Sequence, residues 1–291
     1  LYVACRKDLP QTDLSYCFYG SSFSTPTRLD NILNHITTVS NMEYCFYGTS
    51  TSNIDVLSHV NFLPGTSLRY CFAGCPNITE LSDVVLSSNI GDASYMFSGS
   101  GLRSINNVST SCGTIVGMFS NCDNLVEVNN FTASATTSYE SLFEGCGGMT
   151  VAPIVEIPST IVNISKMYKD CSSLVSIDGM VLHGNIIDTT EFIAGCNNLI
   201  NANNVTIGGS FYNDIFRGIT SIKYVNNLLI SYVGRSMTFA HMFDGCSNLV
   251  EMSFHDDSYV KDVISMDYMF AGTSMRTVNF SNVNFEKVTS I

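Results

Sequence analysis

Apolar and polar positions recur along this chain with a period of about 25 residues. Each repeat is centred on an apolar residue that usually follows a second one, as in YMF and HMF. The ten steps between residues 18 and 270 have a mean length of 25.2 residues. Positions in the repeat are counted from the central residue as position 0. The central residues are Phe18, Phe46, Phe72, Phe97, Phe119, Phe143, Tyr168, Ile193, Phe216, Phe243 and Phe270.

The residues around position 0 predict a short helix in each repeat. In ten of the eleven repeats the residue at position −5 is of a type that often caps the start of a helix, as at Asp13 and Ser265. Such side chains accept hydrogen bonds from backbone N–H groups. Apolar residues at −4, −1 and 0 have the spacing of one buried helical face. Position +2 is glycine in nine repeats, and glycine tolerates the left-handed conformation that ends a helix. We therefore expect about two helical turns per repeat.

A second pair of apolar positions, +6 and +9, predicts a turn that leads into a short strand, as in NLVEVNN and SLVSIDG. No single repeat can bury its apolar side, so the repeats are expected to stack. The predicted fold is α/β: a leucine-rich-repeat-type solenoid of about eleven coils, with a parallel sheet on one face and short helices on the other. It is expected to form one domain over residues 1–291.

The last residues of the chain align with the start of a further repeat. Residues 288–291 match residues 263–266, so a twelfth repeat is expected to begin near Ser290, with Ile291 at its first buried position. Solenoids need polar terminal caps. The chain is therefore expected to be a fragment of a longer protein.

The frame M-F-x-G-C-x-x-L-x-x-L resembles the BspA-like repeats of bacterial surface proteins, a subfamily of leucine-rich repeats. MFDGCSNLVEM at residues 242–252 carries this frame, and the last repeat looks like the related surface-lipoprotein repeat. The resemblance covers nearly the whole chain. It implies an extracellular or cell-surface protein that binds protein or glycan in adhesion and carries no catalysis.

Composition excludes several classes of partner. Charged residues make up 13% of the chain, against about 25% in average proteins. The net charge of −12 argues against nucleic acid and anionic membranes as partners. No segment approaches the roughly 18 apolar residues of a membrane span. We expect no nucleic-acid partner and no membrane span.

The eleven cysteines follow the repeat, which argues against a disulfide framework or a metal site. Three lie at −1, and six lie at +3, where serine, threonine and isoleucine also occur. Small residues that share one phase predict a ladder of buried thiols. A disulfide among Cys122, Cys146, Cys171 and Cys196 remains the alternative, while zinc lacks any C-x-x-C pair.

No motif points to catalysis. The five histidines share no phase, and the chain contains no G-x-S-x-G, P-loop or H-E-x-x-H sequence. We therefore expect no catalytic residues, no metal and no cofactor.

The best candidates for binding lie beside the apolar position +9 of the predicted strand. If +9 points into the core, +8 and +10 point outward on the concave face of the sheet. An amide-rich face with one tyrosine suits a glycan or a polar protein surface, and the alternative is a solvated face without a ligand. The predicted binding residues are Glu80, Ser82, Glu127, Asn129, Ser176, Asp178, Asn201, Asn203, Tyr224, Asn226, Glu251 and Ser253.

Two further side-chain patterns follow the repeat. Asn-Asn pairs begin at Asn106, Asn129, Asn203 and Asn226, and the second asparagine is expected to satisfy backbone groups in a turn. Tyrosine recurs at −2, where it either packs between coils or contacts a neighbouring subunit. These tyrosines are Tyr16, Tyr44, Tyr70, Tyr95 and Tyr268. They motivate an alternative function, a structural or receptor-binding component of a larger assembly such as a phage tail or virion.

Overall fold

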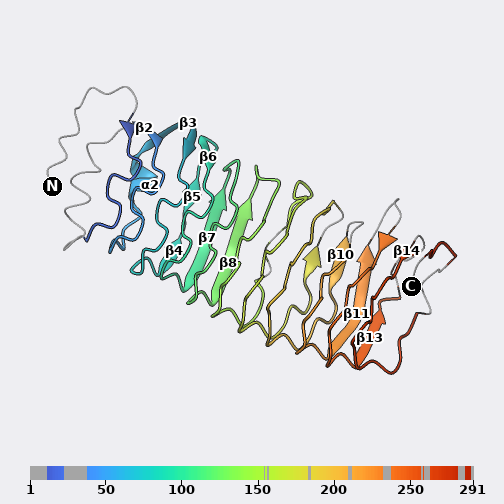
Figure 1. Cartoon of the computed structure of the whole chain (residues 1–291). Helices are drawn as coiled ribbons and strands as arrows, with labels where there is room; N and C mark the ends of the chain where they lie inside the picture. The colour runs from blue at the N-terminus through green and yellow to red at the C-terminus, as the bar shows by residue number, and fades with distance from the viewer. Residues whose placement is uncertain are drawn as a thin grey trace. The chain divides into compact units, whose positions relative to one another are not determined.

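The computed structural model describes most of the chain as a succession of parallel β-coils (Figure 1). It divides into two compact units, Leu1–Thr137 and Ser138–Ile291, which are described separately. The expected start of a twelfth repeat at Ser290 and Ile291 lies outside the described residues. The described residues are 12–22, 38–153, 155, 157–182, 185–208, 212–231, 237–256, 258, 263–280 and 286–289.

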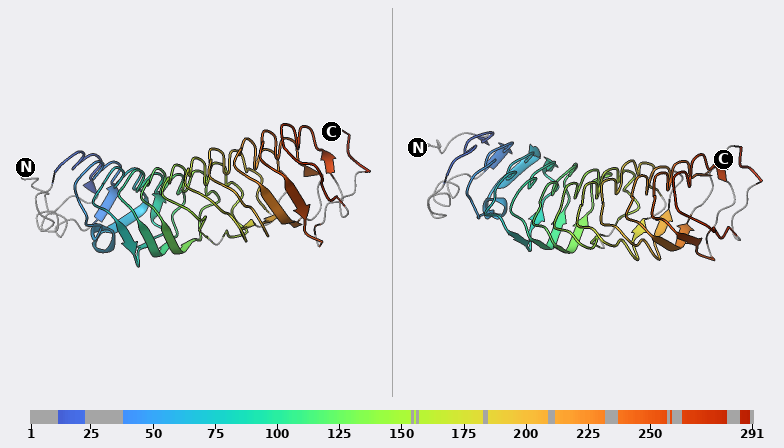
Figure 2. Two further views of the ribbon diagram at one scale, coloured as in Figure 1. Left: turned by 90° about the horizontal axis from the view of Figure 1, so that it is seen from below. Right: turned by 60° about the horizontal axis from the view of Figure 1, so that its bottom comes forward.

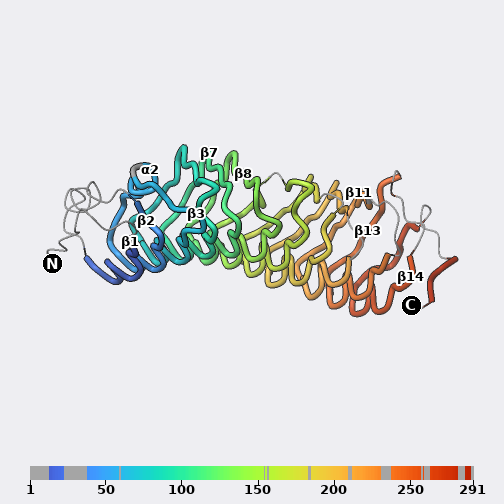
Figure 3. The backbone as a smooth tube through the Cα atoms, turned by 90° about the horizontal axis from the view of Figure 1, so that it is seen from above, coloured from blue at the N-terminus to red at the C-terminus, as the bar shows by residue number. Residues whose placement is uncertain are grey.

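The first unit contains two parallel sheets, which run along different sides of its coils. One sheet has the order β1-β2-β3-β6, and Figure 3 shows β1, β2 and β3 side by side. In the other sheet β7 pairs with β4 and β5 on one side and with β8 on the other. The strands are β1 (Thr12–Asp13), β2 (Thr38–Asn41), β3 (Asn61–Ser67), β4 (Glu80–Ser82), β5 (Val85–Leu86), β6 (Ile90–Asp92), β7 (Ser104–Thr110) and β8 (Glu127–Ala133).

The second unit repeats this plan, with part of the pairing made by single bridges. Its larger sheet has the order β13-β11-β10-β9, and β12 pairs with β14. Isolated parallel bridges extend the same pairing, for example Ser138 to Asn163 and Ser176 to Asn201. Figure 2 shows the sharp bends of successive coils aligned within each unit. The strands are β9 (Val181–Leu182), β10 (Thr206–Gly208), β11 (Tyr224–Ser231), β12 (Met237–Thr238), β13 (Glu251–Phe254) and β14 (Val263–Ser265).

The parallel solenoid is confirmed, but the short helices predicted for the other face are wrong. Within the described residues the α-helical segment is α2 (Val56–His59), which lies away from the predicted positions. Positions −4 to +3 form overlapping β-turns instead. The total of eleven coils stays a prediction, because parts of several repeats fall outside the described residues.

Backbone conformation explains why these segments cannot be helical. Position −2 has a positive φ, between 53° and 61°, in all eleven repeats, and position +2 has a φ between 56° and 78°. A left-handed residue cannot continue a right-handed helix, and each one closes a turn. The predicted left-handed residue at +2 is therefore confirmed, but it has a partner four residues earlier.

Hydrogen bonds in the turn segment alternate between local and inter-coil partners. The N–H of Cys45 donates to the carbonyl of Met42 at 3.1 Å, three residues back in the same coil. The N–H of Phe46 donates to the carbonyl of Cys71 in the next coil at 2.8 Å. The same alternation recurs in both units, so the turns satisfy their backbone groups and stack as regularly as a sheet.

The cap-like residues at −5 do accept backbone N–H groups, although they start turns. Asp13 Oδ1 accepts from the N–H of Ser15 at 2.8 Å, and Asn163 Oδ1 accepts from Ser165 at 2.7 Å. A bond from two residues ahead is an Asx-turn, which uses the same side chains as a helix cap.

The predicted apolar positions form the core of each unit. Aromatic residues at position 0 stack along the first unit, with ring centroids 5.1 Å apart for Phe46 and Phe72 and 5.7 Å apart for Phe72 and Phe97. Phe216 and Phe243 stack in the same way at 5.1 Å in the second unit. Full burial of each ring contributes roughly 1.5–3 kcal/mol, so the stacked rings are a main source of stability.

Candidate binding surfaces

The predicted sheet face is built from parallel strands that pair with one another within each unit. Glu80 pairs with Ser104, which pairs with Glu127, and Ser82, Asn106 and Asn129 form the neighbouring row. In the second unit Ser176, Asn201, Tyr224 and Glu251 form one row, and Asp178, Asn203, Asn226 and Ser253 follow at +10.

Burial on these strands alternates as predicted. Leu81, Ile177 and Val225 at +9 are buried, whereas residues at +8 and +10 are exposed or half-buried. Tyr224 is 39% exposed. The structure thus places the twelve predicted residues on two polar faces, one in each unit, and their role in binding stays a prediction.

An exposed aliphatic row, not anticipated from the sequence, borders the polar face at position +7. In the second unit this row includes Val175, Ile200 and Val250. The N–H of Ile200 donates to the carbonyl of Val175 at 2.9 Å, so the row keeps the register of the coils. Apolar and polar side chains therefore run side by side, as they do in protein interfaces.

Asparagine side chains join neighbouring coils on this face. Asn129 Nδ2 donates to Asn106 Oδ1 at 3.0 Å, and Asn130 Nδ2 donates to Asn107 Oδ1 at 2.9 Å. Asn107 and Asn130 have φ values of 53° and 56°. The expected bonds from the second asparagine to turn backbone groups are not found at these two positions, because both residues lie within strands and their side chains bond side chains of the neighbouring coil. Asparagine is suited to the position because it adopts the left-handed conformation at low cost.

Substitution of Asn130 by alanine is expected to lower the free energy of unfolding by about 2 kcal/mol. The variant loses the bond to Asn107 and places alanine in the left-handed region, and each effect costs on the order of 1 kcal/mol. Substitution by glycine restores the backbone freedom, so we expect it to cost about half as much. Urea denaturation of both variants checks this, and equal losses would contradict the backbone contribution.

The tyrosines at −2 form a stacked ladder along one edge of the first unit. Ring centroids are 4.9 Å apart for Tyr16 and Tyr44, and 4.8 Å apart for Tyr44 and Tyr70 and for Tyr70 and Tyr95. The stack passes onto Gly117, where a Cβ atom would lie 2.3 Å from the Tyr95 ring. We call Tyr16, Tyr44, Tyr70 and Tyr95 the tyrosine ladder. The predicted packing between coils is confirmed, and contact with another subunit stays a prediction.

A second column at +1, missed in the sequence, widens this surface. Tyr19 and Tyr47 stack at 5.0 Å, and Tyr44 meets Tyr47 in a tilted contact at 5.7 Å. Burial is the main cause that raises the pKa of Tyr44, followed by the neighbouring Tyr70 and Tyr16. Comparison of position +1 across all repeats would have found this column.

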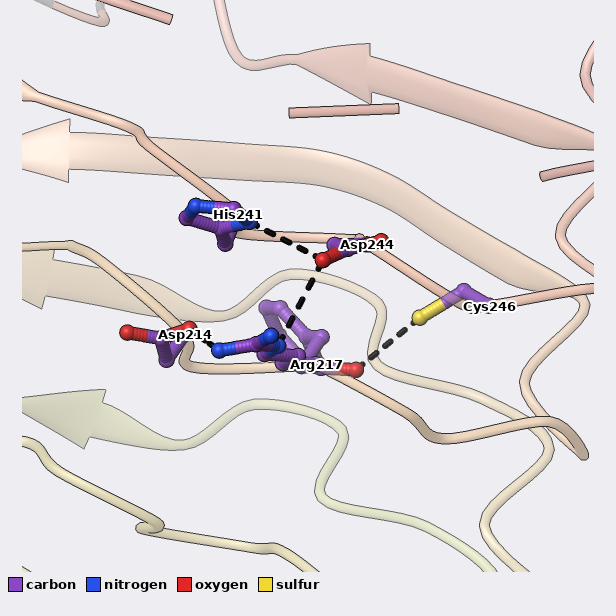
Figure 4. Close-up of polar contacts among 6 residues, drawn as sticks. Asp214, Arg217, His241, Asp244 and Cys246 are labelled. Atoms are coloured by element: carbon purple, nitrogen blue, oxygen red, sulfur yellow. Dashed lines mark hydrogen bonds and ion pairs between the residues drawn. The ribbon is translucent and has the colours of Figure 1, made fainter. Parts of the chain in front are cut away.

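Repeat positions −2 and +1 carry charged residues and a histidine in the second unit. Arg217 Nη1 contacts Asp214 Oδ1 at 3.0 Å, and Arg217 Nε lies 3.4 Å from Asp244 Oδ2. His241 Nδ1 lies 2.9 Å from the same Asp244 oxygen, as Figure 4 shows. Together they form a partly exposed polar network, in which the arginine–aspartate ion pairs contribute little to stability. Sequence reasoning missed it because its members share positions −2 and +1 and not a residue type.

The thiol beside this network is unsuited to nucleophilic chemistry. Cys246 Sγ donates to the carbonyl of Phe216 at 2.9 Å, and burial raises the pKa of Cys246 to about 12. A thiol with such a pKa stays protonated at neutral pH and is inert as a nucleophile.

Other cysteines at +3 repeat the contact of Cys246. Cys75, Cys122, Cys171 and Cys196 each donate to the position-0 carbonyl of the preceding coil, at 3.0–3.2 Å. None of the ten described cysteines forms a disulfide, which confirms the predicted thiol ladder; Cys5 lies outside the described residues.

Two further features are absent from the described part of the chain. It contains no group of three or more His, Cys, Asp or Glu residues arranged to hold a metal ion. It also contains no helix that is long and apolar enough to cross a membrane.

Comparison with known proteins identifies the repeat. The model of the family described as "BspA type Leucine rich repeat region" matches this chain in six copies, over residues 14–116 and 93–223. The chain belongs to this BspA-type leucine-rich repeat family. The matched BspA-type copies begin at the first described turn segment and extend into the second unit.

A solved structure also resembles this BspA-type chain. It is a leucine-rich repeat protein from Bacteroides ovatus ATCC 8483, with 14% sequence identity and a TM-score of 0.33. The match covers 84% of this chain and 75% of the other. No curated protein matches the chain.

Proposed function

We propose that this chain is a non-catalytic binding solenoid that acts in adhesion, displayed on a bacterial surface or secreted. Its ligand is a protein or a glycan held on the polar face at +8 and +10. Membership of the BspA-type family supports a role in surface binding. The observation that carries the proposal is the register of the strands, which aligns polar side chains of successive coils into continuous rows.

The geometry suits recognition by many contacts of modest strength. Neighbouring parallel strands are about 4.8 Å apart, so each row offers a hydrogen-bonding group at short, regular intervals. The backbone beneath is held by hydrogen bonds between coils, so the side chains are presented on a rigid base. The aliphatic row at +7 adds apolar area beside the polar rows.

Tyr224 is the best candidate for an energetic centre of this face in the second unit. Exposed tyrosines are enriched among residues that dominate binding energy. Asn203 Oδ1 accepts from the backbone N–H of Asn226 at 3.1 Å, so the amide side chain of Asn203 is held against the strand that carries Tyr224. An aromatic ring beside ordered amides fits a sugar or the polar surface of a protein.

A second candidate function is a structural or receptor-binding component of a larger assembly such as a phage tail or virion. The tyrosine ladder favours it, because exposed tyrosines on a rigid edge are typical of contacts between chains. The genes that flank this one separate the candidates: a lipobox, sortase or secretion signal supports adhesion, and a trimeric tail-attachment region supports the assembly.

A binding screen against glycans and host proteins tests the sheet face. The double variant Tyr224→Ala, Asn226→Ala is expected to weaken binding of any ligand found by about tenfold or more, because it removes an exposed ring and a neighbouring amide side chain from the same strand. Tyr268→Ala is the matched control, since Tyr268 is 66% exposed in the same unit but stacks on His241 at the turn edge. Equal binding by wild type and the double variant would rule out this face in the second unit.

A further inference from the structure

One arginine of the first unit lies along the tyrosine ladder. The guanidinium carbon of Arg69 is 5.3 Å from the centroid of the Tyr70 ring and 5.5 Å from that of Tyr95. Arg69 Nη1 is 3.6 Å from Asp92 Oδ2. The ladder therefore already holds one cation between two tyrosine rings and a carboxylate.

The equivalent place two coils earlier also has two stacked tyrosine rings, but no long side chain at position −3. Arg69 occupies position −3, and the residue at −3 in the first coil is Ser15. The rings beside Ser15 are those of Tyr16 and Tyr44, which stack at 4.9 Å, and Tyr16 is 56% exposed. Ser15 is too short to cover them as Arg69 covers the later pair.

The two coils that form this place each contribute one carboxylate. Asp13 Oδ1 accepts from the backbone N–H of Ser15 at 2.8 Å, and its carboxylate also contacts the side chain of Asn41. Asn41 stands at the position that Asp92 holds beside Arg69. Glu43 lies next to Tyr44, with its Oε1 atom accepting from Ser67 Oγ at 2.8 Å. The place thus combines ring surface with two negative charges.

We propose that the tyrosine ladder binds an arginine-bearing, cationic segment of a partner protein, whose guanidinium lies along Tyr16 and Tyr44 between Asp13 and Glu43. The net charge of −12 attracts such a segment over longer distances. Arg69 shows within the protein the contact that the incoming side chain makes.

Ring geometry argues for this occupant over a sugar. A sugar stacks on the open face of an aromatic ring, but the ladder turns each inner face against its neighbour, with interplanar angles of 5–16°. What remains is mainly ring edges, hydroxyl groups and carboxylates. A planar guanidinium can lie alongside two stacked rings, as Arg69 does, and donate several hydrogen bonds to carboxylates at once, whereas the ammonium group of lysine lacks this planar fork of donors.

Calorimetric titration with a tetra-arginine peptide tests the site, with a tetra-lysine peptide for comparison. Wild type is expected to bind the arginine peptide more tightly than the lysine peptide. The variant Tyr16→Leu, Tyr44→Leu keeps every charge and is expected to weaken arginine binding about fivefold or more. The pair Asp13→Asn, Glu43→Gln keeps the rings and is expected to weaken it as well.

A gain of binding provides a test that misfolding cannot imitate. Arg69→Gln frees Tyr70, Tyr95 and Asp92 and is expected to add a second arginine site, seen as higher stoichiometry. Arg103→Gln removes the same charge from an exposed residue outside the ladder and is expected to leave the stoichiometry unchanged.

Three results would overturn the proposal: equal titrations for Arg69→Gln and Arg103→Gln, equal affinity for lysine and arginine peptides, or full binding by the tyrosine double variant. Analytical sedimentation of the wild type tests whether a second copy of this chain occupies the ladder. Dimers that disappear in Tyr16→Leu, Tyr44→Leu would identify a second copy of this chain and overturn a foreign partner. Since the ladder is separate from the sheet face, Tyr224→Ala should leave arginine binding unchanged, which keeps the two proposals distinguishable.

Discussion

Replacement of Phe243 by alanine is expected to lower the free energy of unfolding of the second unit by about 3–5 kcal/mol. Phe243 is fully buried and stacks on Phe216 at 5.1 Å and on Phe270 at 5.7 Å. Alanine leaves a cavity between them that the hydrogen-bonded coils cannot close, because their spacing is fixed by the backbone.

Phe270→Ala is the matched control for this prediction. Phe270 occupies position 0 of the next repeat but is only half-buried, so its removal creates less cavity and is expected to cost less than half as much. Urea denaturation followed by circular dichroism measures both variants. Equal losses would show that the stacked rings do not stabilise this unit in proportion to their burial.

Alkaline pH is expected to destabilise the protein through its buried thiols. Burial raises the pKa of Cys112 and Cys122 to about 11 and that of Cys196 and Cys246 to about 12, from a usual value of 9.0. In the unfolded chain these thiols ionise as the pH passes 9, whereas in the folded chain they stay protonated up to pH 11–12. Their contribution is therefore complete below pH 9 and is lost progressively as the pH rises towards 11–12.

The expected loss from these four thiols is about 5 kcal/mol between pH 8 and pH 10. The variant Cys196→Ser, Cys246→Ser is expected to lose about half as much through them. Serine fits at +3, because other repeats hold Ser100 and Thr49 there. Urea midpoints at both pH values, with a reductant present, measure the difference. A wild type and a variant with the same pH dependence would contradict a role for the thiols.

Sequence patterns predicted the solenoid because the apolar residues of its core recur at the same positions of each repeat. Phe72, Leu68 and Cys71 are buried as the apolar spacing required, and Leu81 is buried on the predicted strand. Register followed from the repeat itself, since residues with the same position in successive repeats must pair when the coils stack.

The prediction of a helix was wrong because the same residue types also favour consecutive turns. Asp13 and Asn163 accept backbone bonds in either structure, and glycine at +2 ends either one. The deciding feature is the left-handed residue at −2, where tyrosine, lysine and glutamate occur. These residues rarely adopt a positive φ on their own, so only stacking of the coils imposes it.

Part of each candidate surface was also beyond the sequence pattern. The polar rows at +8 and +10 could be predicted from strand alternation, but the exposed Val175 and Ile200 at +7 could not, because the turn before the strand breaks the alternation. The cradle of Arg69 depends on how rings from two coils lie together, which no single repeat reveals.

The alternating hydrogen bonds of the turn segment separate the shape of a coil from its outward chemistry. Main-chain groups hold one coil on the next, so positions −3, −2 and +1 can exchange tyrosine for lysine, aspartate or histidine without a change of path. Such a chain can acquire new specificities by single substitutions along its rim while the scaffold stays constant. It also invites engineering: side chains transplanted from one rung to the same place on another should keep their mutual geometry.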